Sequence, residues 1–96
     1  MTKAEIVNSI ADKLGFEKAD AQAIVEHFMK EVKSALESGE NVYLRGFGSF
    51  VIKKRKAKKG RNISKNVTID IPAHNIPSFK PAKVFLNEVK TKVDVN

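Results

Sequence analysis

A run of basic side chains dominates the middle of the sequence. Nine Lys or Arg residues and no carboxylate lie between Glu40 and Asp70, and eight of the nine fall within residues 53–65. A protein core cannot take up this charge, because burying unpaired ammonium or guanidinium groups costs several kcal/mol each. The segment must therefore lie in water or against a polyanion, which favours binding to nucleic acid.

The residues on both sides of this run have the period-two pattern of β-strands. Phe50 and Ile52 hold alternate positions before it, and Val67, Ile69 and Ile71 do so after it. Each flank is therefore predicted to be a strand with one apolar face. Two such strands joined through a basic, turn-containing tip form a projecting β-ribbon arm, a shape suited to gripping nucleic acid.

Ile63 is the only bulky apolar residue inside the basic run. At the tip of a cationic arm, with no core in reach, such a residue either pads the turn or touches a ligand. Proteins that bind the minor groove commonly insert an apolar wedge between base steps. On the residues alone, both interpretations of Ile63 stay open.

Other candidate groups lack the neighbours that catalysis or metal binding requires. His27 and His74 are far apart, there is no Cys, and there is no HExxH motif. The glycines at positions 46 and 48 are not followed by the rest of a phosphate loop, and no serine has the context of a nucleophile elbow. We therefore predict no enzymatic activity, no cofactor and no metal site.

The distribution of charge divides the chain into two parts. Residues 1–40 hold five basic and eight acidic side chains, whereas residues 41–96 hold thirteen basic and three acidic ones. This split indicates one face for phosphates and an N-terminal part for packing. A membrane surface also attracts cations, but a peripheral membrane protein usually carries them on an amphipathic helix, and here they lie on predicted strands.

Size and composition predict a single domain that associates with itself. Of the 96 residues, 42% are hydrophobic and six are Phe, which is more apolar material than one small body can bury beside an exposed arm. The lack of Cys suits a reducing cytosol. No apolar run approaches the ~18–20 residues of a membrane span, and the first residues do not resemble a signal peptide. We expect a soluble, cytoplasmic protein.

Two helices are predicted before the basic run. Thr2 and Glu5 match a capping box, apolar residues then recur at helical spacing as far as Leu14, and Gly15 supplies a left-handed stop. A longer helix is predicted over residues 18–38, and the two helices together form an αα-hairpin. The later elements are predicted as strands at 41–45 and 49–56, an irregular segment at 72–75, an extended segment at 76–79, and a last helix that begins at Pro81 and ends near residue 90.

Several segments together form a specific set of motifs. They read RGFGSF at 45–50, GRN at 60–62, IxIP at 69–72 and FKPxK at 79–83, with basic residues at positions 55 and 58. With these motifs the chain resembles, from Thr2 to Lys90, the HU/IHF family of bacterial nucleoid DNA-bending proteins. The resemblance implies an α+β intertwined dimer with a helical dimerisation part (1–40), an antiparallel sheet with a long, protruding DNA-binding arm (41–79) and a short C-terminal helix (81–90).

The resemblance assigns DNA contacts to Arg55, Lys58, Arg61, Asn62, Lys3, Lys18 and Lys83, and the dimer core to Phe47, Phe50 and Phe79. The full sets of expected residues are larger. The residues expected to contact DNA are Lys53, Arg55, Lys58, Lys59, Arg61, Asn62, Ile63, Ser64 and Lys65 on the arm, and Lys3, Lys18, Arg45, Lys80 and Lys83 on the body. The expected dimer core contains Phe28, Phe47, Phe50 and Phe79.

Two features of the resemblance bear on mechanism. The family's Arg-Asn-Pro is replaced here by Arg61-Asn62-Ile63, which places Ile63 at the position of the intercalating wedge. The hexapeptide RGFGSF is similar to the β-type subunit of IHF, which acts with a different α subunit. A homodimer is expected, and a heterodimer with a related subunit stays open.

The charge pattern and the resemblance predict a histone-like protein of the nucleoid. It is expected to bind and bend double-stranded DNA through phosphate and minor-groove contacts, with low sequence specificity. A site-specific, IHF-like bending factor is the alternative. An RNA-binding protein is a third possibility, although A-form grooves do not suit a two-armed minor-groove clamp.

Overall fold

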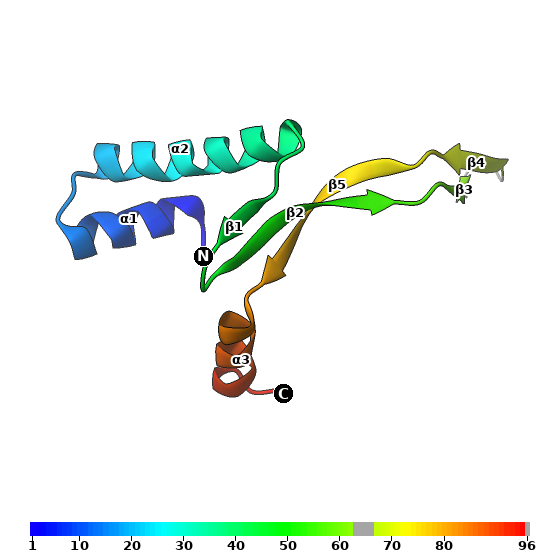
Figure 1. Cartoon of the computed structure of the whole chain (residues 1–96). Helices are drawn as coiled ribbons and strands as arrows, with labels where there is room; N and C mark the ends of the chain where they lie inside the picture. Colours follow the sequence, from blue (N-terminus) through cyan, green and yellow to red (C-terminus); the bar gives the residue numbers. More distant parts are fainter. Residues whose placement is uncertain (63–66, 96) are drawn as a thin grey trace.

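The computed structural model describes residues 1–62 and 67–95, and for Asn62 only the backbone. In chain order the elements are α1 (Lys3–Leu14), α2 (Lys18–Glu37), β1 (Val42–Leu44), β2 (Gly48–Arg55), β3 (Lys58–Asn62), β4 (Val67–Ile71), β5 (His74–Pro81) and α3 (Lys83–Lys92). Figure 1 shows the α1–α2 hairpin beside a small sheet, α3 beyond one end of the sheet, and a β-ribbon arm that projects away from both. The predicted α+β architecture is confirmed.

The two N-terminal helices form the predicted αα-hairpin. The Glu5 amide donates to the Thr2 hydroxyl oxygen at 3.3 Å, and Gly15 follows α1 with a left-handed φ of 73°. Both features are helix-end signals that depend only on neighbouring residues. Between the helices, Val7 and Ala11 of α1 and Ala21 of α2 are buried, so small side chains let the two backbones approach.

The body sheet is antiparallel, with the strand order β1-β2-β5. β2 pairs with β5 along its whole length, from Gly48 opposite Pro81 to Arg55 opposite His74. β5 is an edge strand, a position in which the missing amides of Pro77 and Pro81 are tolerated.

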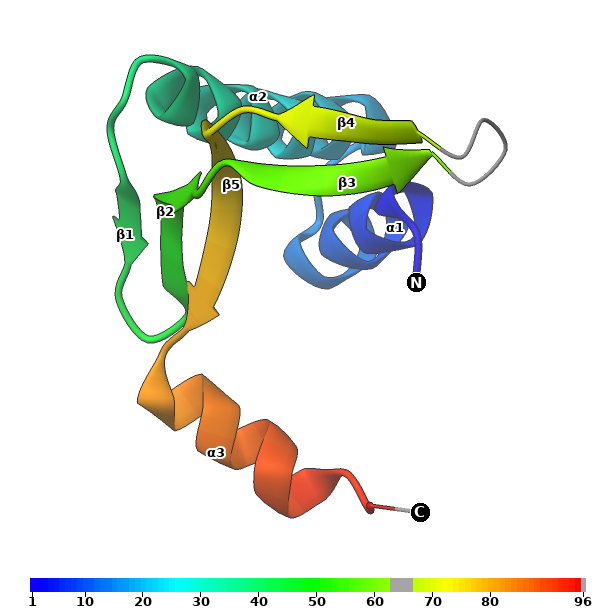
Figure 2. The same ribbon diagram turned by 90° about the vertical axis from the view of Figure 1, so that its right-hand side faces the viewer.

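The arm is a separate hairpin in which β3 and β4 pair over five residues. Breaks at 56–57 and 72–73 separate these strands from β2 and β5. In Figure 2, β3 and β4 run across the direction of β2 and β5, so the ribbon turns at the breaks. The predicted projecting arm is confirmed, whereas the strand predicted over 49–56 ends one residue earlier, at Arg55.

The prediction of an irregular segment over 72–75 is wrong for its second half. His74 and Asn75 already belong to β5, where they pair with Arg55 and Lys54 of β2. Pro72 interrupts the local pattern, but the partner strand supplies backbone hydrogen bonds to the residues that follow it. A non-local partner therefore decides where this strand begins.

The last helix is displaced from its predicted range of 81–90 and runs from Lys83 to Lys92. Pro81 is paired opposite Gly48, and the Ala82 amide donates to the Phe47 carbonyl at 3.0 Å. These contacts keep the chain extended through Ala82, whose ψ is 151°. The helix can begin only after them.

A single chain buries little of its own apolar surface. Of the residues that the structure describes, only Val7, Ala11 and Ala21 are buried hydrophobic ones. The accessible surface is 8394 Å², whereas a compact monomer of this mass exposes about 5,500 Å². The Cα radius of gyration is 18.8 Å, against about 12.5 Å for a compact chain of this length. The fold is extended and leaves apolar surface uncovered.

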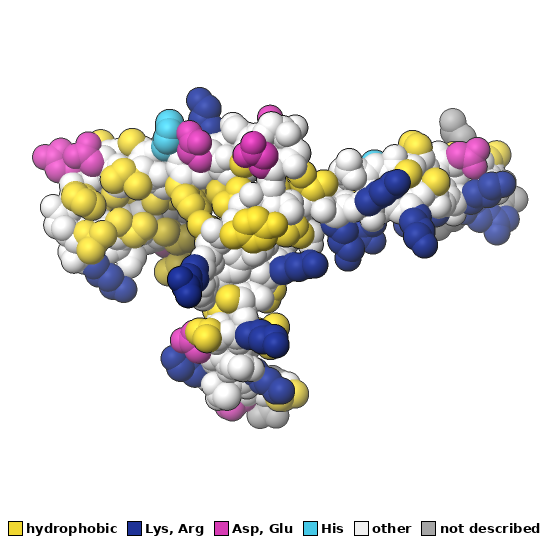
Figure 3. Space-filling view, viewed as in Figure 1, with side chains coloured by type: hydrophobic (Ala, Val, Ile, Leu, Met, Phe, Trp, Pro, Cys, Tyr) yellow, Lys and Arg dark blue, Asp and Glu magenta, His cyan; other side chains and the backbone are white. Residues whose placement is uncertain are grey.

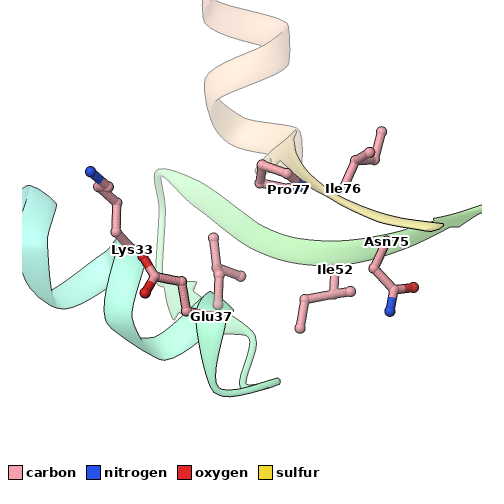
Figure 4. A pocket seen from close by; sticks show the side chains of 7 residues that line it. Lys33, Glu37, Ile52, Asn75, Ile76 and Pro77 are labelled. Atoms are coloured by element: carbon pink, nitrogen blue, oxygen red, sulfur yellow. The ribbon is translucent and has the colours of Figure 1, made fainter.

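An unfilled hollow of about 330 Å³ lies between the C-terminal end of α2 and the sheet. Leu36 of α2 and Ile52 and Pro77 of the strands line it, together with Lys33 and Glu37 (Figure 4). No side chain of the described residues fills this space, so the chain does not complete its own packing here.

Candidate nucleic-acid interface

The register of the body sheet separates its aromatic side chains from its basic ones. Residues opposite each other in an antiparallel pair share a face, and alternate residues along a strand point to opposite faces. Phe50 of β2 is paired with Phe79 of β5. Lys53, Arg55 and Lys80 occupy the alternate positions of the same two strands. One face of the sheet is therefore aromatic, and the other, which we call the basic face, carries Lys53, Arg55 and Lys80.

The aromatic rings pack together on their side of the sheet. The Phe47 ring centroid lies 5.1 Å from that of Phe79 and 5.6 Å from that of Phe85, and the Phe50 and Phe79 centroids are 4.9 Å apart. Gly48 makes room for this cluster, because a Cβ at its position would lie 2.6 Å from the Phe79 ring. The cluster thus lies on the face of the sheet opposite Lys53, Arg55 and Lys80.

The basic residues of the arm occupy both faces of the ribbon. Lys59 and Arg61 lie on one face, with Asp70 and Thr68 as their cross-strand partners, whereas Lys58 lies on the other face. DNA-binding proteins that use β-ribbons place their strands in the major or the minor groove. Cations on both of its faces can then reach phosphates on both sides of that groove.

The second face of the arm is largely apolar. Val67, Ile69 and Ile71 of β4 lie on it opposite Asn62, Gly60 and Lys58. A Cβ on Gly60 would lie 2.9 Å from Cδ1 of Ile71, so the glycine lets this side chain lie directly on the β3 backbone. The predicted alternation is confirmed, and it produces a thin ribbon.

Two of the predicted flank residues lie together on the helical hairpin. Lys3 of α1 and Lys18 of α2 line one depression of about 140 Å³, together with Gln22. The Lys3 ammonium is 3.8 Å from the Glu26 carboxylate, which also accepts a hydrogen bond from Gln22 at 2.8 Å. An ion pair this exposed is weak, so a phosphate could compete with Glu26 for Lys3.

The remaining predicted residues gather at the base of the sheet. Arg45 follows β1, and it lines a depression of about 240 Å³ with Lys80. Lys83 is the first residue of α3, which begins beside this depression. Figure 3 shows basic side chains along the arm and down the body to α3, while acidic ones gather over the helical hairpin.

Part of the predicted interface lies outside the described residues. Ile63, Ser64 and Lys65 fall in this part of the arm, and of Asn62 only the backbone is described. The roles predicted for these side chains stay predictions.

Tyr43 and Ser49 also lie on the basic face, and neither was predicted to contact DNA. Tyr43 of β1 pairs with Ser49 of β2, which in turn pairs with Lys80 of β5. The signal was present in the sequence, because Val42 and Leu44 mark the apolar face of β1 and alternation places Tyr43 on the opposite side.

Each histidine contacts a residue close to it in the chain. His27 lies 3.3 Å from the Glu31 carboxylate on exposed α2, and the His74 Nδ1 donates to the Pro72 carbonyl at 3.0 Å. Within residues 1–62 and 67–95, no three or more His, Cys, Asp or Glu side chains are grouped so that they could hold a metal ion. In the same part of the chain, no helix has the length and apolarity needed to cross a membrane.

Comparison with protein families agrees with this arrangement. The family described as bacterial DNA-binding protein matches residues 1–90. The chain belongs to this family. The resemblance to HU and IHF is thereby confirmed over almost the whole sequence.

Individual members of the bacterial DNA-binding protein family match nearly end to end. The chain is 42% identical over 92 residues to the SPbeta prophage-derived DNA-binding protein HU 2 of Bacillus subtilis, covering 96% of this chain and 100% of that protein. It is 38% identical over 93 residues to the integration host factor subunit alpha of an Anaeromyxobacter species, covering 97% of this chain and 82% of that protein. An Anabaena HU crystallised with DNA has a TM-score of 0.89 at 38% identity, covering 93% of this chain and 97% of that one.

Proposed function

We propose that this member of the family is a histone-like architectural protein that binds and bends duplex DNA with low sequence specificity. The observation that carries the proposal is the register of the body sheet, which aligns Lys53, Arg55 and Lys80 on the face opposite the aromatic cluster. Lys59 and Arg61 continue the positive charge along the arm. Cations arranged in this way contact phosphates, which position a protein on DNA but carry no sequence information. This role needs no catalytic residue.

A homodimer is the second part of the proposal. Phe47 and Phe79 are 45% and 37% exposed, and Phe28 is also exposed, although all three are large apolar side chains. The hollow beside Leu36 is a further uncovered apolar surface. A second copy of the chain could cover these surfaces, as stable dimers do with their apolar interfaces. A related subunit could do the same, so a heterodimer is the alternative.

The parts of the chain then have different roles. Residues 1–40 supply the helical part of the dimer, residues 41–81 supply the sheet and the arm, and α3 packs its Phe85 against the aromatic cluster. Two arms from one dimer could reach round a duplex from both sides, while the basic faces hold it between them. Binding along a curved path would bend the DNA and organise the chromosome within the nucleoid.

Fluorescence energy transfer between dyes at the two ends of a duplex tests this function. Wild-type protein is expected to bind intact duplexes of unrelated sequence with similar affinity and to raise the transfer efficiency of each. Binding to duplex RNA serves as the control, and it is expected to be much weaker. Binding without any change in transfer would contradict bending, and a preference for RNA would contradict the proposal as a whole.

Site-specific bending is a second candidate function, because one relative is an integration host factor subunit. Specific DNA-binding proteins favour their sites over other sequences by at least about 10³-fold. An affinity ratio of that size between a naturally bent site and random duplex would favour this candidate. A ratio near one supports the architectural role.

A further inference from the structure

Tyr43 lies on the basic face of the body sheet, in the middle of β1. It forms one row across the three strands with Ser49 and Lys80, its neighbours in the register. Its side chain is 72% exposed, whereas Val42 and Leu44 on either side of it are partly buried. A large aromatic ring with a polar tip therefore extends into solvent beside the cations.

The phenol group of Tyr43 is oriented by Asn41. The Ile52 amide donates to Oδ1 of Asn41 at 3.0 Å, which fixes the direction of the Asn41 amide group. Its other end, Nδ2, donates to the Tyr43 hydroxyl oxygen at 3.2 Å. Because a phenol hydroxyl both donates and accepts, the Tyr43 oxygen is used as an acceptor and its proton stays available for a further acceptor.

The row borders the depression of about 240 Å³ at the base of the sheet. Arg45, Ser49 and Lys80 line this depression together with Tyr43. Among the described residues, no Asp or Glu lines it. Two basic and two hydroxyl-bearing residues thus line the depression, together with Leu44, Gly46, Gly48, Pro81 and Ala82. Basic and hydroxyl side chains both donate to phosphates, and no carboxylate competes with them here.

We propose that Tyr43 is a further DNA-contacting residue, which donates a hydrogen bond to a backbone phosphate held at this depression by Arg45 and Lys80. The inference rests on the proposed DNA-binding function. A hydroxyl contact differs from that of a cation, because it releases no counterion from the DNA. It is a directional bond to a charged acceptor, so it fixes the position of the duplex on the sheet and adds affinity that salt does not screen away.

The experiment compares wild type, Tyr43→Phe and Lys80→Ala in the full-length protein, with affinity for duplex DNA measured over a range of salt concentrations. Tyr43→Phe removes one oxygen atom and keeps the ring. We expect its affinity to fall roughly tenfold, with an unchanged slope of log affinity against log salt. Lys80→Ala is expected to lower the size of that slope by about 0.9. The melting temperature of Tyr43→Phe should equal that of wild type, because the ring is exposed.

Duplexes that each carry one neutral methylphosphonate linkage, at a different position in each, identify the acceptor while the other phosphates still hold the protein. When the neutral linkage replaces the phosphate that Tyr43 contacts, the difference between wild type and Tyr43→Phe is expected to disappear. If Tyr43→Phe binds ordinary duplex as tightly as wild type while Lys80→Ala binds more weakly, the Tyr43 inference is wrong and the proposed function stands. A reduced salt slope for Tyr43→Phe would also overturn it. If wild-type protein binds no DNA, both the inference and the proposed function are wrong.

Discussion

The body sheet and the arm share antiparallel pairing, yet they differ in what covers their apolar faces. In the body, the Phe50 and Phe79 rings lie 4.9 Å apart within an aromatic cluster. In the arm, Val67 and Ile69 stay about half exposed beside Gly60. The same period-two alternation therefore has two outcomes, depending on whether a second layer of structure lies within reach. In the body it produces an aromatic cluster whose rings stay partly exposed in a single chain, and in the arm it produces a thin ribbon.

Because of this difference, we expect stability and DNA binding to depend on different residues. A substitution in the aromatic cluster should change the free energy of unfolding and the amount of dimer, whereas a substitution of an arm cation should change the affinity for DNA. Each experiment below challenges that separation.

The largest effect on stability is expected from Phe47→Ala. Its ring contacts those of Phe79 and Phe85, and in the proposed dimer the second copy would bury it. Truncating a buried Phe costs about 3–5 kcal/mol. Melting temperature and dimer content should fall together, as measured by thermal unfolding and sedimentation. Ile69→Ala in the arm is the matched control and should cost less than about 1 kcal/mol. A folded monomeric wild type would contradict the role assigned to Phe47.

Substituting glycine by alanine in the two regions sharpens the comparison. At Gly48 a new Cβ would lie 2.5 Å from the backbone oxygen of Lys80, which cannot move without disturbing the ladder. At Gly60 the nearest atom, at 2.9 Å, is the end of the flexible Ile71 side chain. We expect Gly48→Ala to lower the free energy of unfolding by about 1–3 kcal/mol and Gly60→Ala to lower it much less. Equal losses in denaturant titrations would show that the arm is packed as tightly as the body.

Arg61→Ala should have the smallest effect on stability and a clear effect on binding. Arginine presents a planar fork of donors to phosphates and to narrow minor grooves, and Arg61 lies on the exposed arm. Affinity for duplex DNA should fall while the melting temperature stays the same. Lys30→Ala on α2, a basic residue away from the basic face, is the control and should leave affinity unchanged. A marked loss of melting temperature in Arg61→Ala would mean that the arm supports the fold.

The parts of the fold that could be predicted from sequence depend on residues close together in the chain. Thr2 caps α1 and Gly15 ends it, as their identities indicate. The start of β5 could not be predicted in this way, because His74 joins the sheet through Arg55. The start of α3 depends likewise on the contact between Ala82 and Phe47.

The candidate site shows the same limit. The sequence identifies the basic residues, but it does not say which of them share a face. Lys58 and Lys59 are neighbours in the chain and lie on opposite faces of the arm, while Arg55 and Lys80 share the basic face although they are far apart in sequence. Only the register decides these groupings. Tyr43 was missed because its role depends on the same register and not on charge.

The central claim is that the basic face and the arm contact DNA phosphates together, and the salt dependence of binding tests it most directly. Each phosphate contact by a cation adds about 0.9 to the slope of log affinity against log salt. Wild-type protein should therefore show a steep linear fall in affinity for intact duplex. Combining Lys53→Ala, Arg55→Ala and Arg61→Ala should reduce the slope by about 0.9 for each residue without lowering the melting temperature. A nearly flat response of the wild type, or an unchanged slope in the triple variant, would contradict the account.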